Sequence, residues 1–213
     1  MNQLALVLTV IMLGVTPLQH PMAADDTGLY DPVPPEGSAF VRFVSDYEIS
    51  GSKPVKVNGK TYDYLDYKEA SSYFVFPAGD INAQVGEASK KFPVEEGRFY
   101  TAILAENGTM NIQADPENDN QAKAQILLYN LSGQDNLSLK TADGAIEVIP
   151  PVGHGKMSNK QINPVRVSLA IYNGDKKIKD LGSVSLERSQ SYSAILASGD
   201  DINWVKATTN TTR

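Results

Sequence analysis

Hydrophobic and polar residues follow one another along this chain in short runs that are typical of β-strands. Ile81, Ala83 and Val85 alternate with polar residues, so this segment is expected to bury one face in a sheet. Similar runs rich in Val, Ile, Tyr and Phe recur about every 8 to 12 residues, separated by turn sequences such as Asn58-Gly59 and Asn173-Gly174. Asn and Gly both tolerate positive φ, which favours tight hairpins at these two places. The pattern predicts an all-β protein of the sandwich or barrel type.

Two stretches of the sequence are nearly the same. YTAILAENG begins at Tyr100 and YSAILASGD at Tyr192, which puts them 92 positions apart. A polar turn precedes each stretch, at residues 95–97 and 187–189, and a strand-like segment precedes each turn. Each copy is therefore expected to form a hairpin, and the repeat indicates two domains of one kind. A chance match is the alternative, because short strand sequences converge under the same residue preferences.

The repeat and the polar stretches between apolar runs give a domain plan. We expect two tandem antiparallel β-sandwich domains of jelly-roll type, at residues 28–112 and 122–207. Residues 113–121 are expected to be a linker, because this polar stretch contains a proline and has no apolar periodicity. Residues 149–164 are rich in Pro and Gly and are expected to form a long loop in the second domain, either as a functional element or as disorder.

Residues 1–24 have the composition of a secretory signal peptide. The apolar run from Leu4 to Val15 is too short for a permanent membrane-spanning helix, and Ala23-Ala24 precedes an acidic pair in the manner of a cleavage site. A buried N-terminal helix is the alternative. No later segment is long and apolar enough to cross a membrane, so we expect no span in the mature chain. The chain has no Cys, and stability without disulfides favours the bacterial periplasm as its location.

The residues that usually carry catalysis are sparse. Beyond the expected signal peptide the chain has one His, His154, and no Gly-x-Ser-x-Gly motif accompanies it, so a Ser-His-Asp triad is not indicated. A zinc site would depend mostly on carboxylates, which is uncommon. Asp115, Glu117 and Asp119 resemble the start of a calcium loop, but Asn120 stands where that loop needs Gly. We therefore expect a solvated acidic linker here, and no enzymatic activity, metal or cofactor.

Charge and aromatic residues point to a binding protein. The net charge of −6 argues against nucleic acid as a partner. Aromatic residues concentrate in the first half, where tyrosines and lysines gather in a stretch that could form a platform for sugar rings or for a protein partner. Tyrosines packed at the edge of the core are the alternative interpretation. The candidate interaction surface consists of Tyr62, Tyr64, Tyr67, Lys53, Lys56 and Lys60.

The residues after the expected cleavage site resemble a known family. The stretch ADDTGLYDPVPPEGSAFVR, residues 24–42, is similar to the start of the mature alginate O-acetylation accessory proteins, the AlgF family, and PAGDINAQVG at 77–86 is similar as well. The resemblance implies a non-catalytic periplasmic adaptor required for O-acetylation of alginate. It also implies a periplasmic O-acetyltransferase and a membrane O-acyltransferase as partners, with alginate as a further candidate ligand.

A carbohydrate-binding module for an acidic exopolysaccharide is the alternative function. The two halves of the chain differ in charge: residues 25–108 carry 14 acidic and 8 basic residues, a net of −6, while residues 109–213 carry 11 of each. An acidic domain is repelled by a polyanion such as alginate, although salt screens the repulsion beyond about 8 Å. Charge therefore favours the adaptor over the carbohydrate-binding module.

Overall fold

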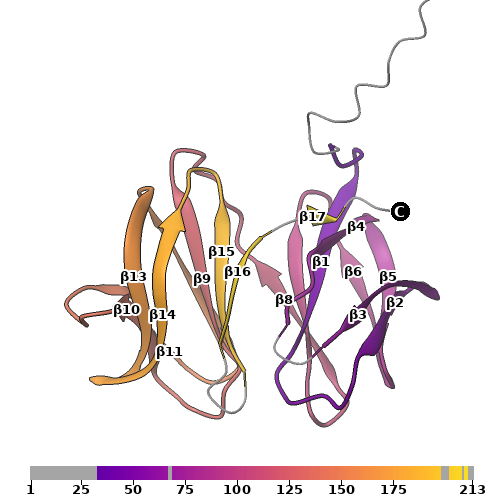
Figure 1. The fold of residues 1–213 in the computed structure, drawn as a ribbon. Helices are drawn as coiled ribbons and strands as arrows, with labels where there is room; N and C mark the ends of the chain where they lie inside the picture. The colour runs from indigo at the N-terminus through magenta and orange to yellow at the C-terminus, as the bar shows by residue number, and fades with distance from the viewer. Residues whose placement is uncertain (1–32, 67–68, 198–201, 208, 211–213) are drawn as a thin grey trace, which may run out of the picture. The chain divides into compact units, whose positions relative to one another are not determined.

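The strands of the first half form two sheets that enclose a hydrophobic core (Figure 1). One sheet has the strand order β17-β4-β1-β7-β8 and the other β3-β2-β5-β6. The short β17, which comes from the end of the chain, pairs with β4. The strands are β1 Ser38–Ser45, β2 Lys53–Val57, β3 Lys60–Leu65, β4 Tyr73–Pro77, β5 Gly79–Val85, β6 Ala88–Val94, β7 Phe99–Leu104, β8 Met110–Asp115 and β17 Thr209–Asn210.

The strands of the second half repeat this plan around a core of their own. One sheet has the order β11-β10-β13-β14 and the other β12-β9-β15-β16. Buried side chains of both sheets form the second core cluster. The strands are β9 Ala124–Asn130, β10 Leu137–Thr141, β11 Glu147–Val152, β12 Lys156–Ile162, β13 Val165–Asn173, β14 Lys176–Leu186, β15 Ser191–Leu196 and β16 Ile202–Lys206.

This computed structural model describes residues 33–66, 69–197, 202–207 and 209–210. Within these ranges the regular elements are strands, and no helix there is long and apolar enough to span a membrane. The expected signal peptide at 1–24 lies outside the described residues and stays a prediction.

The predicted fold class, all-β with two tandem β-sandwich domains, is confirmed. Each sandwich also contains a central parallel pair, which the antiparallel prediction did not include: β1 pairs with β7 and β9 pairs with β15. β8 ends at Asp115 and β9 begins at Ala124, so the connection overlaps the expected linker at 113–121. The domain boundaries themselves stay a prediction.

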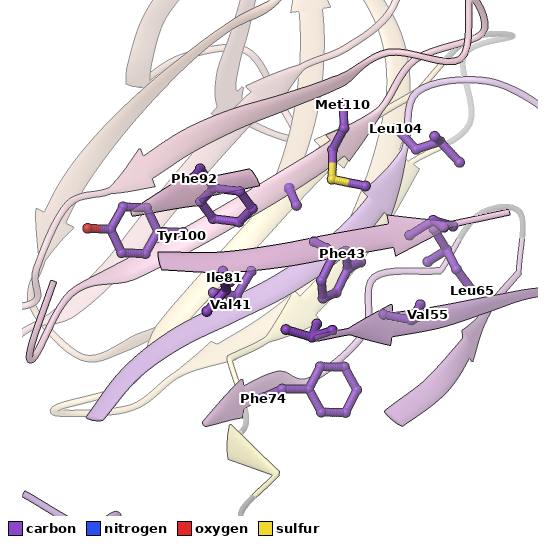
Figure 2. Close-up of a cluster of buried hydrophobic side chains, with 14 of the residues drawn as sticks. Val41, Phe43, Val55, Leu65, Phe74, Ile81, Phe92, Tyr100, Leu104 and Met110 are labelled. Atoms are coloured by element: carbon purple, nitrogen blue, oxygen red, sulfur yellow. The ribbon is translucent and has the colours of Figure 1, made fainter. Parts of the chain in front are cut away.

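The core of the first sandwich is rich in aromatic side chains. Figure 2 shows Phe43 of β1 and Phe74 of β4 among the aliphatic residues of the facing sheet, such as Val55 and Ile81. The rings of Phe43 and Phe74 are tilted against each other with 6.3 Å between centroids. The predicted alternation around Ile81 is confirmed, because Ile81, Ala83 and Val85 are buried in this core.

The repeated sequence forms a corner in each sandwich, and the predicted hairpins are wrong. β6 and β7 belong to different sheets, as do β14 and β15, so the turn between each pair carries the chain across the sandwich. The Tyr100 hydroxyl accepts a hydrogen bond from the Glu95 backbone N–H at 3.1 Å, and the Tyr192 hydroxyl accepts the equivalent bond from Glu187 at 3.2 Å. A Tyr hydroxyl that bonds the backbone a few residues upstream stabilises such corners in other β-sandwiches.

The long loop expected at 149–164 is also wrong, because this segment contains most of β11 and all of β12. β11 is an edge strand, and its pairing with β10 shifts register between Leu137 and Lys140. Pro150 and Pro151 fall in this irregular part of β11. Prolines are tolerated there because an edge strand with a bulge does not need every N–H for the ladder.

Two central strands are buried on both faces, which brings the sandwiches into direct contact. Side chains that alternate along β1 and β9 point either into their own core or toward the other sandwich. The second set forms a third hydrophobic cluster together with Ile103 of β7 and Ile195 of β15, and residues 33–213 make up one compact unit. The buried members of this third cluster are Val44, Ile103, Leu127, Tyr129, Leu131 and Ile195.

Candidate functional site

A buried ion pair lies where the two sandwiches meet. Arg42 of β1 is 1% exposed, and its Nη2 atom lies 3.9 Å from Oδ2 of Asp115 at the end of β8. The guanidinium Nε donates to Oγ1 of Thr101 on β7, and Nη2 donates to Oγ of Ser193 on β15, each at 2.9 Å. Thr101 and Ser193 are 92 positions apart, so they occupy the same place in the two copies of the repeat. One arginine thus bonds the corresponding hydroxyl of both sandwiches.

Hydroxyl groups surround the carboxylate of this pair. Asp115 accepts hydrogen bonds from the Tyr73 hydroxyl at 2.6 Å, from Thr101 Oγ1 at 2.7 Å and from the Tyr129 hydroxyl. The guanidinium of Arg42 lies over the rings of Tyr73 and Tyr129, 4.8 and 5.3 Å from their centroids. Buried charges are costly unless they are paired and hydrogen-bonded, and both conditions are met here. The network therefore joins four strands of the first sandwich to β9 and β15 of the second.

Burial changes the titration of the two tyrosines in this network. It raises the pKa of Tyr73 well above the ordinary value of 10.0, because desolvation penalises the phenolate. Burial also raises the pKa of Tyr129, and the negative charge of Asp115 adds to the effect. Both hydroxyl groups therefore stay protonated at physiological pH and remain donors to Asp115.

A cleft with a volume of about 390 Å³ opens beside the buried network. The two repeated corners line it: Gly97 and Phe99 contribute from the first sandwich, and Ser189 and Ser191, 92 positions later, contribute from the second. The repeat therefore builds both sides of the cleft. The other residues of the lining are Tyr73, Asp115, Pro116, Glu117, Asn118, Asp119, Gln121, Gln125, Leu127, Gln190, Ser193 and Ala207.

The segment that connects the sandwiches forms one wall of the cleft, and side chains of the second sandwich hold it. Gln125 Nε2 donates to the carbonyl oxygens of Pro116 and Glu117, both at 3.2 Å. Gln161 Nε2 donates to Oδ1 of Asp119 at 2.6 Å. This wall is therefore preformed, although the side chains of Glu117 and Asp119 are exposed.

Two stacked aromatic rings lie at the edge of the cleft. Phe40 of β1 and Phe99 of β7 are half-buried, with 4.4 Å between their centroids and an interplanar angle of 10°. Tyr73 meets Phe99 edge-on at 5.1 Å. Among the described residues, none of the three hydrophobic clusters includes Phe40 or Phe99. Their partly exposed surface is therefore available to a ligand beside the cleft.

The lining of the cleft is acidic and polar. It includes three carboxylates, Asp115, Glu117 and Asp119, while none of the described lining residues is Lys or Arg. In the part of the chain that the structure describes, no group of three His, Cys, Asp or Glu is placed to hold a metal ion. The cleft can therefore form hydrogen bonds with a ligand and attract a positively charged group.

His154 lies in the turn between β11 and β12 and is exposed. Its Nδ1 atom hydrogen-bonds the backbone carbonyl of Ser132, and its backbone N–H donates to Oδ1 of Asp135 at 3.0 Å. The ring is thereby attached to the backbone of the loop after β9. His154 is not among the residues that line the cleft.

The interaction surface predicted from the sequence lies on β2 and β3, away from the lining of the cleft. Tyr62 is half-buried and packs edge-on against Phe74 and Phe76, with 5.7 and 5.1 Å between centroids. Tyr64 is 59% exposed. The pairing of β2 with β3 shifts register beside Tyr62, which gives the two rings different surroundings.

The lysines of that surface follow the same two strands. Lys60 is exposed, and its Nζ lies 5.2 Å from the centroid of the Tyr62 ring. Lys53 and Lys56 on β2 are half-buried. Tyr67 lies outside the described residues. Whether these residues bind a partner stays a prediction.

Sequence reasoning missed the buried network, although one signal for it was present. Arg42 is the one charged residue of β1 and lies within its apolar stretch Ala39–Val44, and a nearly continuous apolar stretch indicates a strand buried on both faces. A charge within such a strand requires a buried partner. The identity of the partner, Asp115, depends on the pairing of β7 with β8 and could not be read from the sequence.

The fold and the cleft define a class of protein: tandem β-sandwiches with an acidic cleft between two equivalent corners. Residues 10–193 match the family described as alginate O-acetyl transferase AlgF, and the chain belongs to this family.

Relatives of known name agree with this assignment. The alginate biosynthesis protein AlgF of Pseudomonas putida is 39% identical over 79% of this chain and 77% of its own length. The protein of the same name from Pseudomonas aeruginosa is 36% identical over 78% of this chain and 76% of its own length. A solved structure of the C-terminal domain of AlgF from P. aeruginosa is 39% identical, covers 40% of this chain and 97% of that domain, and has a TM-score of 0.36.

Proposed function

We propose that this chain is a non-catalytic periplasmic adaptor in alginate O-acetylation. It binds a periplasmic O-acetyltransferase of that system and works beside the membrane O-acyltransferase. Family membership supports the link to alginate, since the relatives from P. putida and P. aeruginosa are named alginate biosynthesis proteins. The leader-like composition of residues 1–24 supports the periplasmic location.

The observation that carries the adaptor role is the joint between the sandwiches. Arg42 and Asp115 are buried and bond to each other and to neighbouring hydroxyl groups, so they hold the structure together. The cleft beside them is open and has preformed walls. A surface that is already ordered loses less entropy when a partner binds, which suits a protein that presents a binding face.

The competing role is catalytic, because the matched family carries a transferase in its description. His154 is the one histidine after residue 24, and its Nδ1 bonds a backbone carbonyl. A nucleophile–base pair would require a Ser hydroxyl within hydrogen-bond reach of this ring. Among the described residues, the hydrogen bond of this ring goes to a carbonyl and not to a Ser hydroxyl, which is why we propose the adaptor role in preference to acetyl transfer by the chain itself.

Two measurements on the purified chain separate these roles. The first is turnover of a chromogenic acetyl ester by the chain alone, with His154→Ala as the comparison. We expect the same background rate for both proteins. The second is affinity capture from periplasmic extract, which we expect to recover the O-acetyltransferase. An acetyl ester rate that depends on His154, or capture of polysaccharide without protein, would overturn the adaptor role.

A carbohydrate-binding role is the second candidate, and the features of β3 that favour it are the exposed ring of Tyr64 and the contact of Lys60 with the ring of Tyr62. Exposed aromatic rings near lysines suit an acidic sugar. In this case alginate oligomers at millimolar concentration should shift the amide signals of Tyr62 and Tyr64. Unchanged signals under these conditions would remove this candidate.

A further inference from the structure

The cleft between the sandwiches is a second binding surface, separate from the tyrosines and lysines of β2 and β3. We propose that it receives the side chain of a Lys or Arg residue from a protein partner. The proposal rests on the adaptor function, which supplies a protein as the partner. Concave sites with preformed walls and a few placed polar groups occur preferentially at domain interfaces, as here.

The charge of the cleft indicates which kind of side chain it can bind. Glu117 and Asp119 line the cleft with exposed side chains, while Asp115 is buried below them within the network. Arg42 offsets the charge of Asp115 and Arg98 offsets that of Glu117, so the negative potential of the cleft comes mainly from Asp119, which accepts a hydrogen bond from the neutral amide of Gln161. The first sandwich extends this potential, because residues 33–108 carry 11 acidic and 8 basic residues, a net of −3. A cationic side chain is attracted, and a polyuronate is repelled.

The present partner of Glu117 is readily exchanged. Arg98 Nη1 lies 2.6 Å from Oε1 of Glu117, and the two side chains are 45% and 51% exposed. Exposed ion pairs contribute little to stability because water screens them. An incoming guanidinium or ammonium group can therefore replace or share this contact without disturbing the fold.

Aromatic residues of the cleft provide an apolar surface for the stem of the incoming side chain. Phe99 lines the cleft, Phe40 stacks behind it at 4.4 Å, and Tyr73 meets it edge-on. Long cationic side chains place their methylene stems on apolar surface and keep the charged head at a polar site. A cation close to an aromatic face gains further attraction from the ring electrons. A stem along Phe99 with its head toward Asp119 and Glu117 satisfies both requirements.

The walls of the cleft are ordered before binding. Gln125 holds the carbonyl groups of Pro116 and Glu117, and Gln161 holds Asp119. Ser189 Oγ donates to Gln121 Oε1 across the corner of the second sandwich. The carboxylate of Asp119 therefore keeps its position when a partner arrives, and Asn in its place can keep the bond from Gln161.

The test measures the affinity of the chain for the O-acetyltransferase of its own acetylation system by isothermal titration calorimetry. Asp119→Asn removes one charge and retains the acceptor for Gln161, and Asp119→Lys reverses the charge. We expect the dissociation constant to rise about threefold to tenfold for Asp119→Asn and further for Asp119→Lys. Phe99→Leu, which keeps apolar bulk but removes the ring, should weaken binding as well.

Asp80→Asn is the matched control. Asp80 is an exposed carboxylate on β5 that pairs with Lys91 at 2.9 Å and lies outside the cleft, so its loss should leave the affinity unchanged. Raising the salt concentration should weaken the binding of the O-acetyltransferase to the parent chain more than its binding to Asp119→Asn, since one charge contact is missing in the variant. Urea unfolding of each variant checks that the fold is intact.

The outcomes of these experiments distinguish a failure of the cleft proposal from a failure of the adaptor role. If the O-acetyltransferase binds the parent chain and all cleft variants equally, the cleft proposal is wrong and the adaptor role stands. If the parent chain does not bind it, the adaptor role fails. If alginate oligomers shift the amide signals of Phe99 and Ser191, the occupant is a carbohydrate and the proposed basic side chain is wrong.

Discussion

Replacing Arg42 with Met removes the positive charge from the joint and leaves the Asp115 carboxylate buried beside it. The Arg42 Nη2 and Asp115 Oδ2 atoms are 3.9 Å apart, and both side chains are at most 2% exposed. At that distance two unit charges attract by about 4 kcal/mol in an effective dielectric of about 20. Hydroxyl donors remain on Asp115 and moderate the loss. We therefore expect the free energy of unfolding to fall by about 3 to 5 kcal/mol, as for other buried pairs that lose one partner.

Urea unfolding followed by the fluorescence of Trp204 measures this change. Trp204, the one Trp of the chain, stacks on Tyr192 with 5.7 Å between ring centroids, so unfolding alters its surroundings. The double variant Arg42→Met with Asp115→Asn removes both charges. Its cost should be smaller than the sum of the single costs by about 1 to 3 kcal/mol, because the two groups interact.

Arg98→Met is the matched control for burial. The Arg98–Glu117 pair is shorter, 2.6 Å, but about half exposed, so its loss should leave the urea midpoint nearly unchanged. The reasoning is refuted if Arg42→Met lowers the free energy of unfolding by less than about 1 kcal/mol, the range of exposed pairs. It is also refuted if the Arg42 and Asp115 costs simply add, or if Arg98→Met costs as much as Arg42→Met.

Further predictions concern pH, the corners and the third cluster. Since the pKa values of Tyr73 and Tyr129 are raised in the folded chain, the free energy of unfolding should fall as pH rises above the unfolded pKa of about 10, by up to about 1.4 kcal/mol per pH unit for each tyrosine. Tyr129→Phe should reduce this pH dependence in unfolding measurements between pH 9 and 11. An unchanged pH dependence would contradict the raised pKa of Tyr129. Tyr100→Phe and Tyr192→Phe should each lower the free energy of unfolding in urea by about 0.5 to 1.5 kcal/mol, because each removes one corner hydrogen bond. A loss of stability for only one of the two variants would show that the corners are not equivalent. Ile195→Ala should lower the free energy of unfolding by about 2 to 5 kcal/mol, because it leaves a cavity between the sandwiches. A nearly unchanged free energy of unfolding would show that the third hydrophobic cluster packs loosely.

The sandwich architecture could be predicted because it depends on local signals. Alternation around Ile81 and the turn at Asn58-Gly59 are properties of neighbouring residues, and both behave as expected: Ile81 is buried, and Asn58 and Gly59 have φ of 50° and 83°. The duplication was visible because equal folds place similar demands on equal positions. Tyr100 and Tyr192 occupy the same corner in the two sandwiches.

The errors arose where strand pairing over long range decides the outcome. A strand–turn–strand sequence is compatible with a hairpin or with a crossing between sheets, and only the core decides which forms. Pro150 and Pro151 suggested a loop because they cannot donate to a ladder, yet the edge position of β11 removes that requirement. The cleft is the clearest case, since Phe99 and Asp119 become neighbours in one lining only through the packing of the two sandwiches.

Binding between the purified chain and the periplasmic O-acetyltransferase of its own system tests the adaptor function most directly. Sedimentation velocity of the two proteins, alone and mixed, reports whether a complex forms. The adaptor function predicts a stoichiometric complex that sediments faster than either protein, with no acetyl transfer by the chain alone. Two proteins that sediment independently at micromolar concentration, or a chain that transfers acetyl groups without its partner, would contradict it.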